Sequence, residues 1–468
     1  MPRAGGALDL VVTGGTVVAP TGRVVADVGV ASGRIAAIAE PATLRGAEEV
    51  DARGLWVLPG AVDAHFHVRA PAHPHREDWT SATCAAAAGG ITTLLEMPIS
   101  SPAAYTGAVV RARRELGERQ AVVDFGLFAA PGTLERRDIT SSVEEGAVAF
   151  KVFLHAAPPE RLDEFTGICV TDSRTLYEAF RLVGTTGLGI TAHCEDQGVL
   201  DAVGAAYRGD VGPSAHPRLR PVEAEVVAVA QALAMSEATG TPVHVAHITS
   251  AAAVALVHSA RRRGVRATME TCPHYLEFTA AAMEQHGPFA KVNPPLRGDN
   301  DRAALWHAVL DGSITLVASD HAPFTASEKA VGWTDIRPAP SGTPGVEMLL
   351  PYMMDRALRG TLTVEHAVAL LSKRPARLYG LAPRKGALAP GADADFVLFD
   401  PSGTWTVDRA RLRTKARECA ALWDGFVFAG RIHATYVRGR AVYQDGAVTG
   451  APGWGRFVRP GRTAAVPV

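Results

Sequence analysis

Six residues that lie far apart in the chain have the side chains that a metal site requires. Each stands at or just after the end of a short apolar run, which is where a barrel enzyme carries its chemistry. Imidazole and carboxylate groups are ligands for zinc and its neighbours in the transition series. We therefore interpret the six as candidate ligands of one divalent-metal site: His65, His67, Lys151, His193, His247 and Asp320.

The first two candidates are separated by a single residue in the segment VDAHFH. Side chains alternate between the two faces of a strand, so an H-x-H pair places both rings on one face. Two histidines at this spacing, taken alone, are as typical of a polar strand end as of a metal site. The later candidates His193, His247 and Asp320 favour the metal interpretation.

Lys151 lies inside the apolar run AFKVFL, where a charged ammonium is costly. Burial lowers the pKa of a lysine and exposes a neutral amine. Such an amine can add carbon dioxide and become a carbamate, an anion able to bridge two metal ions. The alternative is a lysine with a buried stem whose ammonium pairs with a carboxylate. The five companion ligands favour the carbamate.

The elements that must position these residues follow two patterns. Residues 8–58 alternate β-branched residues with Gly turns, which predicts short strands. From Pro59, strands alternate with Ala-rich helices, such as 222–240 and 251–264, which close on Gly. Eight alternating strands predict a (β/α)8 TIM barrel, an α/β fold. The predicted strands are 61–67, 90–98, 122–130, 149–154, 187–195, 242–250, 266–276 and 314–324.

Beyond Gly380 the chain returns to short strands and turns. We predict that its two ends pair into one small discontinuous β-sandwich domain. The predicted boundaries are 1–58 and 385–468 for this domain and 59–384 for the barrel. The tail from Gly450 is rich in Pro, Gly and Arg, and is expected to be loose or used in subunit contacts.

Composition excludes several classes of partner. The chain has 468 residues and a net charge of -1, so nothing indicates nucleic acid or an acidic membrane surface. Five cysteines without a C-x-x-C pair favour a reduced, cytoplasmic setting. No window is apolar and long enough to span a bilayer, and the start of the sequence has no signal-peptide apolar block.

A series of motifs resembles the cyclic amidohydrolases, which include hydantoinases and dihydropyrimidinases, allantoinases and dihydroorotases. The motifs occur in family order over nearly the whole chain: PGAVDAHFHVR, AAAAGGITTLLEMP, FKVFL, AHCED, HVAHITS, ETCPHYL, KVNPPLR, SDHAPF and TPGVE. The resemblance implies that His65, His67 and Asp320 hold one metal ion. It also implies that His193 and His247 hold a second, with carboxylated Lys151 and a hydroxide between them.

The same resemblance implies the reaction. The hydroxide attacks the carbonyl carbon of a ring amide, and Asp320 acts as general base and returns the proton to the leaving nitrogen. The expected function is a dinuclear-metal hydrolase of hydantoinase or allantoinase type that opens a small cyclic ureide or imide. The expected ions are Zn²⁺, with Mn²⁺ or Co²⁺ as alternatives, and the expected assembly is a homodimer or homotetramer.

The residues around the metals carry mixed signatures. Arg69 matches the dihydroorotase arginine that grips a carboxylate, for which a guanidinium is well suited, or it forms a structural ion pair at the barrel mouth. Ile99 and Phe324 replace the Asn and His expected in a dihydroorotase. Asn293 and the main chain from Thr343 to Gly345 match places where relatives hold the ring amide.

His155 lies near the place of a hydantoinase tyrosine that this chain lacks. It either replaces that tyrosine as a hydrogen-bond donor or is a solvated loop histidine. The carboxylates of LDEF (162–165) and REDW (76–79) are expected to be solvated. His244, on the same predicted strand as His247 but at an odd offset, is expected behind the ligands or in the core.

Three other functions compete with the expected one. A dihydroorotase-like hydrolase would act on a carboxylated ring. A dihydropyrimidinase-like assembly protein would keep the fold but lose the metal ligands, and the presence of all six argues against it. Deamination or dipeptide cleavage on the same scaffold is disfavoured by KVNPPLR together with TPGVE.

Overall fold

Eight parallel strands form the predicted barrel in the computed structural model, which describes residues 8–461. Strands β6, β7 and β8 make one sheet and β9 to β13 make another. Bridges from Ala129 to Phe150 and from Phe66 to His321 join the two sheets into a closed cylinder. The strands are β6 (Ala61–Phe66), β7 (Ile91–Glu96), β8 (Asp124–Leu127), β9 (Phe150–Phe153), β10 (Ile190–His193), β11 (Val243–Val245), β12 (Ala267–Thr271) and β13 (Leu316–Val317).

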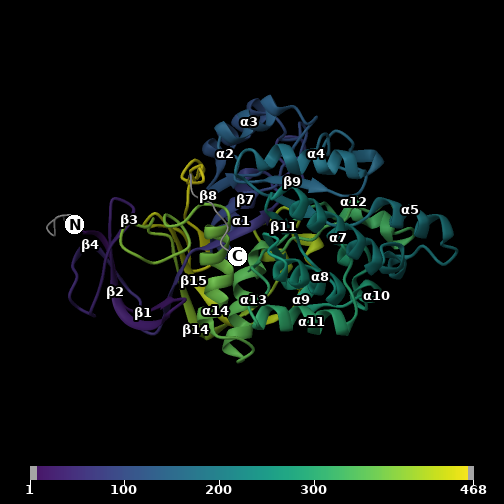
Figure 1. Ribbon diagram of the computed structural model, residues 1–468. Coiled ribbons are helices and arrows are strands. Elements are labelled where there is room, and N and C mark those ends of the chain that lie inside the picture. Colours follow the sequence, from purple (N-terminus) through teal and green to yellow (C-terminus); the bar gives the residue numbers. More distant parts are fainter. Residues whose placement is uncertain (1–7, 462–468) are drawn as a thin grey trace.

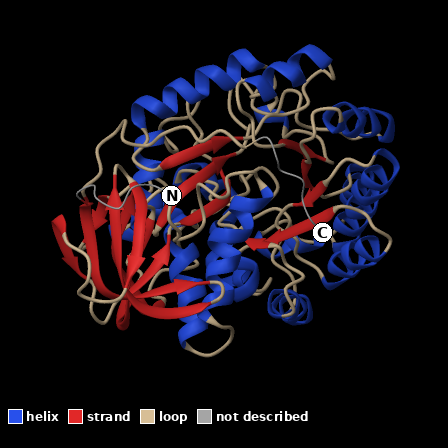
Figure 2. Ribbon diagram, turned by 60° about the vertical axis from the view of Figure 1, so that its left-hand side comes forward, coloured by secondary structure: helices blue, strands red, loops and turns tan. Residues whose placement is uncertain are grey.

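One main helix follows each barrel strand, and the helices surround the strands (Figure 2). The two helices expected from their Ala-rich pattern are confirmed, and α7 ends before Gly240, whose φ of 71° suits glycine. The main helices are α1 (Trp79–Ala88), α2 (Gly107–Gln120), α3 (Arg136–Glu144), α4 (Ser173–Gly184), α7 (Val222–Thr239), α8 (Ala251–Arg262), α11 (Asp299–Leu310) and α13 (Val346–Leu358).

Shorter helices lie in the longer connections and after the barrel. Those within the barrel connections are α5 (Gln197–Ala206), α6 (His216–Leu219), α9 (Pro273–Glu277), α10 (Ala282–His286) and α12 (Ala326–Ala330). After α13 come α14 (Val364–Val368) and α15 (Arg374–Leu378).

Strands from both ends of the chain share one sheet beside the barrel (Figure 1). Strand β5 pairs with β1 on one side and with β14 on the other, so Leu58 faces Val397. Buried side chains of both ends, such as Val12 and Phe396, form one core. The strands are β1 (Leu8–Ala19), β2 (Gly22–Ala31), β3 (Arg34–Ala39), β4 (Gly46–Asp51), β5 (Trp56–Pro59), β14 (Phe396–Thr406), β15 (Val427–Val437), β16 (Arg440–Gln444) and β17 (Ala447–Val448).

The chain after Gly450 packs against the barrel, so the expectation of a loose tail is wrong for residues 450–461. The Val458 N–H donates to the Phe125 carbonyl at 2.7 Å, and the Gly455 N–H donates to the Ala121 carbonyl at 2.8 Å. The Phe457 and Phe125 rings lie 5.7 Å apart. Residues 1–7 and 462–468, the outer ends of the two segments assigned to the small domain, lie outside the described residues.

Across residues 8–461, no helix combines the length and the apolarity needed to cross a membrane.

Candidate metal and substrate site

The structure brings the six metal-ligand candidates to one end of the barrel. His65, Lys151 and His193 lie on β6, β9 and β10, and the other three follow β6, β11 and β13 within three residues. All six are buried: His65, His67, Lys151, His193, His247 and Asp320. They converge because the carboxyl ends of the parallel strands of a barrel meet on a single face.

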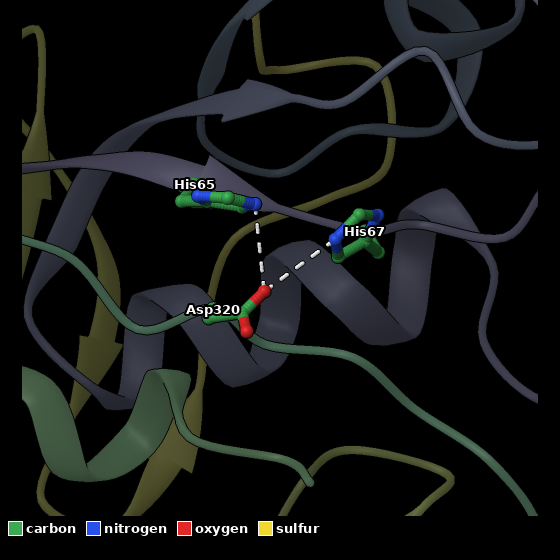
Figure 3. Close-up of side chains that lie close together, drawn as sticks. All are labelled: His65, His67 and Asp320. Atoms are coloured by element: carbon green, nitrogen blue, oxygen red, sulfur yellow. Dashed lines mark ion pairs between the residues drawn. The ribbon is translucent and has the colours of Figure 1, made fainter. Parts of the chain in front are cut away.

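One group of three lies around the Asp320 carboxylate (Figure 3). Its Oδ1 is 3.5 Å from His65 Nε2 and 3.5 Å from His67 Nε2. Burial raises the pKa of Asp320 to about 8. A cation beside this carboxylate would lower that pKa and favour the charged form. The three groups therefore suit one divalent ion.

A second group lies next to the first. His193 Nδ1 and His247 Nε2 are 3.0 Å apart, and the His247 ring centre is 5.1 Å from that of His65. Burial lowers the pKa of His193 to about 3 and that of His65 to about 4, which keeps both rings neutral. Neutral imidazole is the form that binds a metal.

Lys151 has the environment expected of an amine rather than of an ammonium ion. The side chain is fully buried, and its Nζ has no hydrogen-bond partner among the described residues. Burial lowers the pKa of Lys151 to about 8. The alternative of a lysine paired with a carboxylate is not what the described residues show. An unpartnered buried amine between two ligand groups fits the carbamate interpretation.

Two glutamates orient the ligand rings. Glu270 accepts from His65 Nδ1 at 2.5 Å, and Glu195 accepts from His193 Nε2 at 2.8 Å. A carboxylate can only accept, so each ring carries its proton on that nitrogen and directs the lone pair of the other nitrogen into the site. This geometry prepares both histidines for a metal ion.

Each glutamate also has a second partner. Glu270 Oε2 lies 3.1 Å from His244 Nε2, so His244 stands behind the ligands, as expected. The Arg220 guanidinium donates to both oxygens of Glu195. Burial opposes ionisation of Glu195, but the charge of Arg220 outweighs it and holds the pKa of Glu195 well below its usual value.

Three site residues have a positive φ without being glycine: 67° at Arg69, 31° at His247 and 45° at Asp320. Non-glycine residues adopt this region at an energetic cost, and they do so mostly where the surrounding structure holds a functional geometry. The strained backbone aims these three side chains into the same space.

That space is a cavity of about 750 Å³, and five of the six metal-ligand candidates line it, all but the fully buried Lys151. Arg69, His155 and Asn293 line it, as expected of substrate-binding residues. Thr343 and Gly345 do not line it. The Thr343 carbonyl accepts from Ala322 N–H, and the Gly345 N–H donates to the His321 ring, so both face the barrel. The segment 337–342 forms this wall instead.

Arg69 has no ion pair among residues 8–461, so the structure does not bear out the alternative of a structural pair. The side chain is 2% exposed, and its Nε has no hydrogen-bond partner. The guanidinium lies 4.7 Å from the centre of the Phe324 ring, which also contacts Arg76 and Arg161. Burial lowers the pKa of Arg69 to about 9. A buried cation without an anion offers free donors to a ligand.

His155 is buried, so the solvated-loop interpretation is wrong. Its ring lies 4.8 Å from that of His193 and 5.4 Å from that of Phe153. Nδ1 lies 2.7 Å from the Ala156 carbonyl oxygen, while Nε2 has no partner in the described part of the chain. Burial lowers the pKa of His155 to about 4.

The expectation that the LDEF and REDW carboxylates are solvated is wrong for two of them. Glu164 is 1% exposed and accepts from the Arg161 guanidinium at 2.7 and 2.9 Å. Glu77 is fully buried and accepts from the Lys415 N–H at 3.3 Å. Asp163 is exposed, as expected. Neither glutamate has a local sequence signal, because both are buried by segments distant in the chain.

Comparison with known proteins identifies relatives among the amidohydrolases. Residues 56–442 match the model of the amidohydrolase family. The chain is 37% identical to an allantoinase of Deinococcus radiodurans, over 97% of this chain and 99% of the relative. It is 36% identical to a dihydroorotase of Pelotomaculum thermopropionicum, over 94% and 99%. The solved L-hydantoinase (dihydropyrimidinase) of Arthrobacter aurescens superposes with a TM-score of 0.91 at 30% identity, covering 97% of this chain and 100% of that one.

Proposed function

Because the chain belongs to the amidohydrolase family and is a cyclic amide hydrolase, we propose that its substrate is a cyclic ureide of the hydantoin or allantoin type. One observation carries the proposal. The cavity is lined by every ligand candidate except the fully buried Lys151, and its wall is apolar at Ile99, where a dihydroorotase would have an asparagine. Phe324, at the place of a dihydroorotase histidine, is fully buried, and its ring offers no hydrogen bond.

We propose two divalent ions, with zinc as the first candidate and manganese or cobalt as alternatives. His65, His67 and Asp320 would hold one ion, and His193 and His247 the other, with carboxylated Lys151 between them. The unpartnered Lys151 Nζ and the ring orientations set by Glu195 and Glu270 support this assignment. When bound, such ions lower the pKa of water and polarise a carbonyl group.

The protein's own groups would then handle the proton and the substrate. Asp320 is the proposed general base, which takes a proton from the attacking water and returns it to the leaving ring nitrogen. Asn293 Oδ1 is buried without a partner, and the residue lines the cavity, so we propose that it contacts the ring amide. Arg69 would donate to an oxygen of the substrate outside the cleaved bond.

The second candidate is hydrolysis of a carboxylated ring, as in dihydroorotases. The unpaired guanidinium of Arg69 favours it, because a planar guanidinium binds a carboxylate through two hydrogen bonds. Ile99 and Phe324 oppose it, because they stand where a dihydroorotase has an asparagine and a histidine that could bind the substrate.

A substrate panel tests the proposal. The purified protein is assayed with hydantoins, allantoin, dihydrouracil, dihydroorotate and cyclic imides, with and without added zinc or manganese. We expect the highest kcat/KM for a hydantoin or for allantoin. A clear preference for dihydroorotate would replace the first candidate with the second.

Lys151→Ala tests the metal assignment. The substitution removes the only side chain proposed to bridge the two ions, so bound metal and activity should both fall by at least about tenfold. Metal content by mass spectrometry is the measurement, and Lys373→Met, at a partly exposed position outside the site, is the control. Full retention of metal and activity would rule out a carbamate at Lys151.

The setting and assembly stay predictions. All five cysteines are free in the structure, which supports the proposed cytoplasmic setting. Light scattering will decide between a monomer and the expected homodimer or homotetramer.

A further inference from the structure

His155 lies in the wall of the cavity, two residues beyond the end of β9. Its side chain is 7% exposed and is held between neighbouring rings, those of Phe153 and His193. No step of the proposed reaction uses this imidazole. Its Nε2 is nevertheless a buried polar atom without a partner in the described chain, and such atoms are uncommon unless they serve a ligand or an ordered water.

The main chain fixes which kind of partner Nε2 needs. Nδ1 lies 2.7 Å from the Ala156 carbonyl oxygen, and a carbonyl oxygen only accepts hydrogen bonds. The ring proton therefore lies on Nδ1, and Nε2 of the neutral ring presents a lone pair. His155 is an acceptor at this atom, which is the opposite of the donor role expected for a replacement of the hydantoinase tyrosine.

Two polar groups of the cavity wall, on Ala156 and Arg220, have partners within the chain. The Ala156 N–H donates to Gln197 Oε1 at 2.7 Å. Arg220 donates through Nε and Nη2 to Glu195, at 2.8 and 2.7 Å. No donor among the described residues bonds to Nε2, and His155 lines the cavity, so the donor that completes it is expected from a bound ligand.

We propose that His155 Nε2 accepts a hydrogen bond from a substrate N–H that is not part of the cleaved amide. The inference rests on the proposed function and narrows its substrate class. A cyclic ureide has a second ring N–H beyond the cleaved bond, whereas a cyclic imide has a single N–H, which belongs to that bond. His155 is then a specificity-determining residue that selects ureides over imides.

The test compares hydantoin with 1-methylhydantoin, which carries a methyl group on the ring nitrogen outside the cleaved bond. The ratio of their kcat/KM values is measured in the wild type, in His155→Phe and in His155→Gln. We expect the wild type to disfavour the methylated ring by about tenfold or more, because one hydrogen bond is lost and Nε2 stays unpaired. In His155→Phe, of similar size but without an acceptor, the ratio should fall to about twofold.

His155→Gln keeps an acceptor and should retain a ratio well above that of His155→Phe. His307→Phe, at an exposed histidine on α11, should leave the ratio unchanged. Metal content should also stay unchanged in both His155 variants, because His155 is not assigned to the metals. If turnover is absent, calorimetry gives the ratio of the two dissociation constants, which should change in the same direction between the variants.

Two results would overturn the inference while leaving the proposed function intact. The first is an unchanged ratio in His155→Phe with hydantoin still hydrolysed. The second is loss of bound metal in His155→Phe, which would show that His155 serves the metal site, as a ligand or through the adjacent His193 ring, and not the substrate. Failure of the wild type to hydrolyse any cyclic ureide would instead reject the proposed function.

Discussion

His65 and His193 owe their orientation to two glutamates that take no part in the proposed reaction. Glu270 and Glu195 each accept the ring proton of one histidine; Arg220 in turn binds Glu195, and His244 lies 3.1 Å from Glu270. The pairing fixes the tautomer before any metal binds and removes the entropic cost of choosing it. Metal affinity should therefore depend on residues that never touch the metal.

Glu270→Gln tests this dependence. The neutral amide keeps the shape of the side chain but binds the His65 N–H less strongly than a carboxylate does. We expect the affinity for zinc to fall about 10- to 100-fold, measured by competition with a chromophoric chelator. Glu284→Gln, at an exposed position on α10, is the matched control. Equal affinities in Glu270→Gln and wild type would mean that the glutamate only fills space.

At the scale of elements, two connections shape the cavity, and each is held by buried charge. Glu164 joins the segment after β9 to the one after β6, since it accepts from Arg161 and lies 3.2 Å from His73 Nε2. Lys291 holds the segment 336–342 through three of its main-chain carbonyl oxygens, and Lys329 through two, with the Lys291 carbonyl as its third acceptor. An ammonium has three donors, so both lysines are fully satisfied without a carboxylate.

The Glu164 contact should make stability depend on pH. Burial raises the pKa of Glu164, but the hydrogen bonds and charge of Arg161 outweigh it and lower the pKa from 4.5 to about 2. A lowered pKa gives stability that is complete above about pH 4.5 and is lost as the pH falls towards 2. The wild type should have a higher free energy of unfolding than Glu164→Gln, and this difference should decrease by about 2–3 kcal/mol as the pH falls from 4.5 to 2. Urea titrations at several pH values measure it, and a pH-independent difference would contradict the assignment.

Lys329→Met should loosen the cavity wall without touching the metal ligands. The apolar side chain leaves the carbonyls of Lys291, Pro340 and Gly342 without this donor. We expect faster hydrogen exchange in 336–342 and a loss of about tenfold in kcat/KM, because small displacements of substrate-binding groups are costly. Metal content should not change. Lys373→Met serves as the control, and normal exchange in Lys329→Met would show that other contacts hold this wall.

At the scale of the whole molecule, a buried cluster of charges joins the barrel to the small domain. Lys385 Nζ lies 2.5 Å from Asp124 on β8, 3.0 Å from Asp393 and 2.6 Å from Asp395. Arg438, directly after β15, also pairs with Asp124. The three carboxylates raise the pKa of Lys385 despite its burial, so the amine stays charged across the neutral range. The cluster therefore ties the C-terminal part of the small domain to the barrel.

Lys385→Met should be strongly destabilising, because it leaves three buried carboxylates with one cation fewer. Breaking a buried pair in this way costs about 3–5 kcal/mol. Lys415→Met breaks a largely solvated pair with Asp78 and should cost less than about 1 kcal/mol. Thermal unfolding of both variants gives the comparison, and similar shifts in Tm would show that the cluster does not couple the two parts.

Much of the barrel could be read from the sequence because its signals are local. Strands and helices alternate along the chain, and His65 and His67 share one face because a strand has a period of two. Lys151 was distinctive for its apolar neighbours alone. Glu195 stands two residues after His193, and Glu270 opens the ETCPHYL motif. Residue type and position alone do not show that either glutamate is the partner of a ligand ring.

The sequence by itself determined the fold class, the order of the motifs and the six candidate ligands, since these depend on period, spacing and residue type. The tertiary structure alone decided which polar groups are buried and which are left without a partner. Glu164 and Glu77 are covered by distant segments, Thr343 and Gly345 turn towards the barrel, and His155 keeps a free nitrogen in the cavity wall. Burial and hydrogen-bond partners depend on packing between segments remote in the chain, and no local pattern encodes that packing.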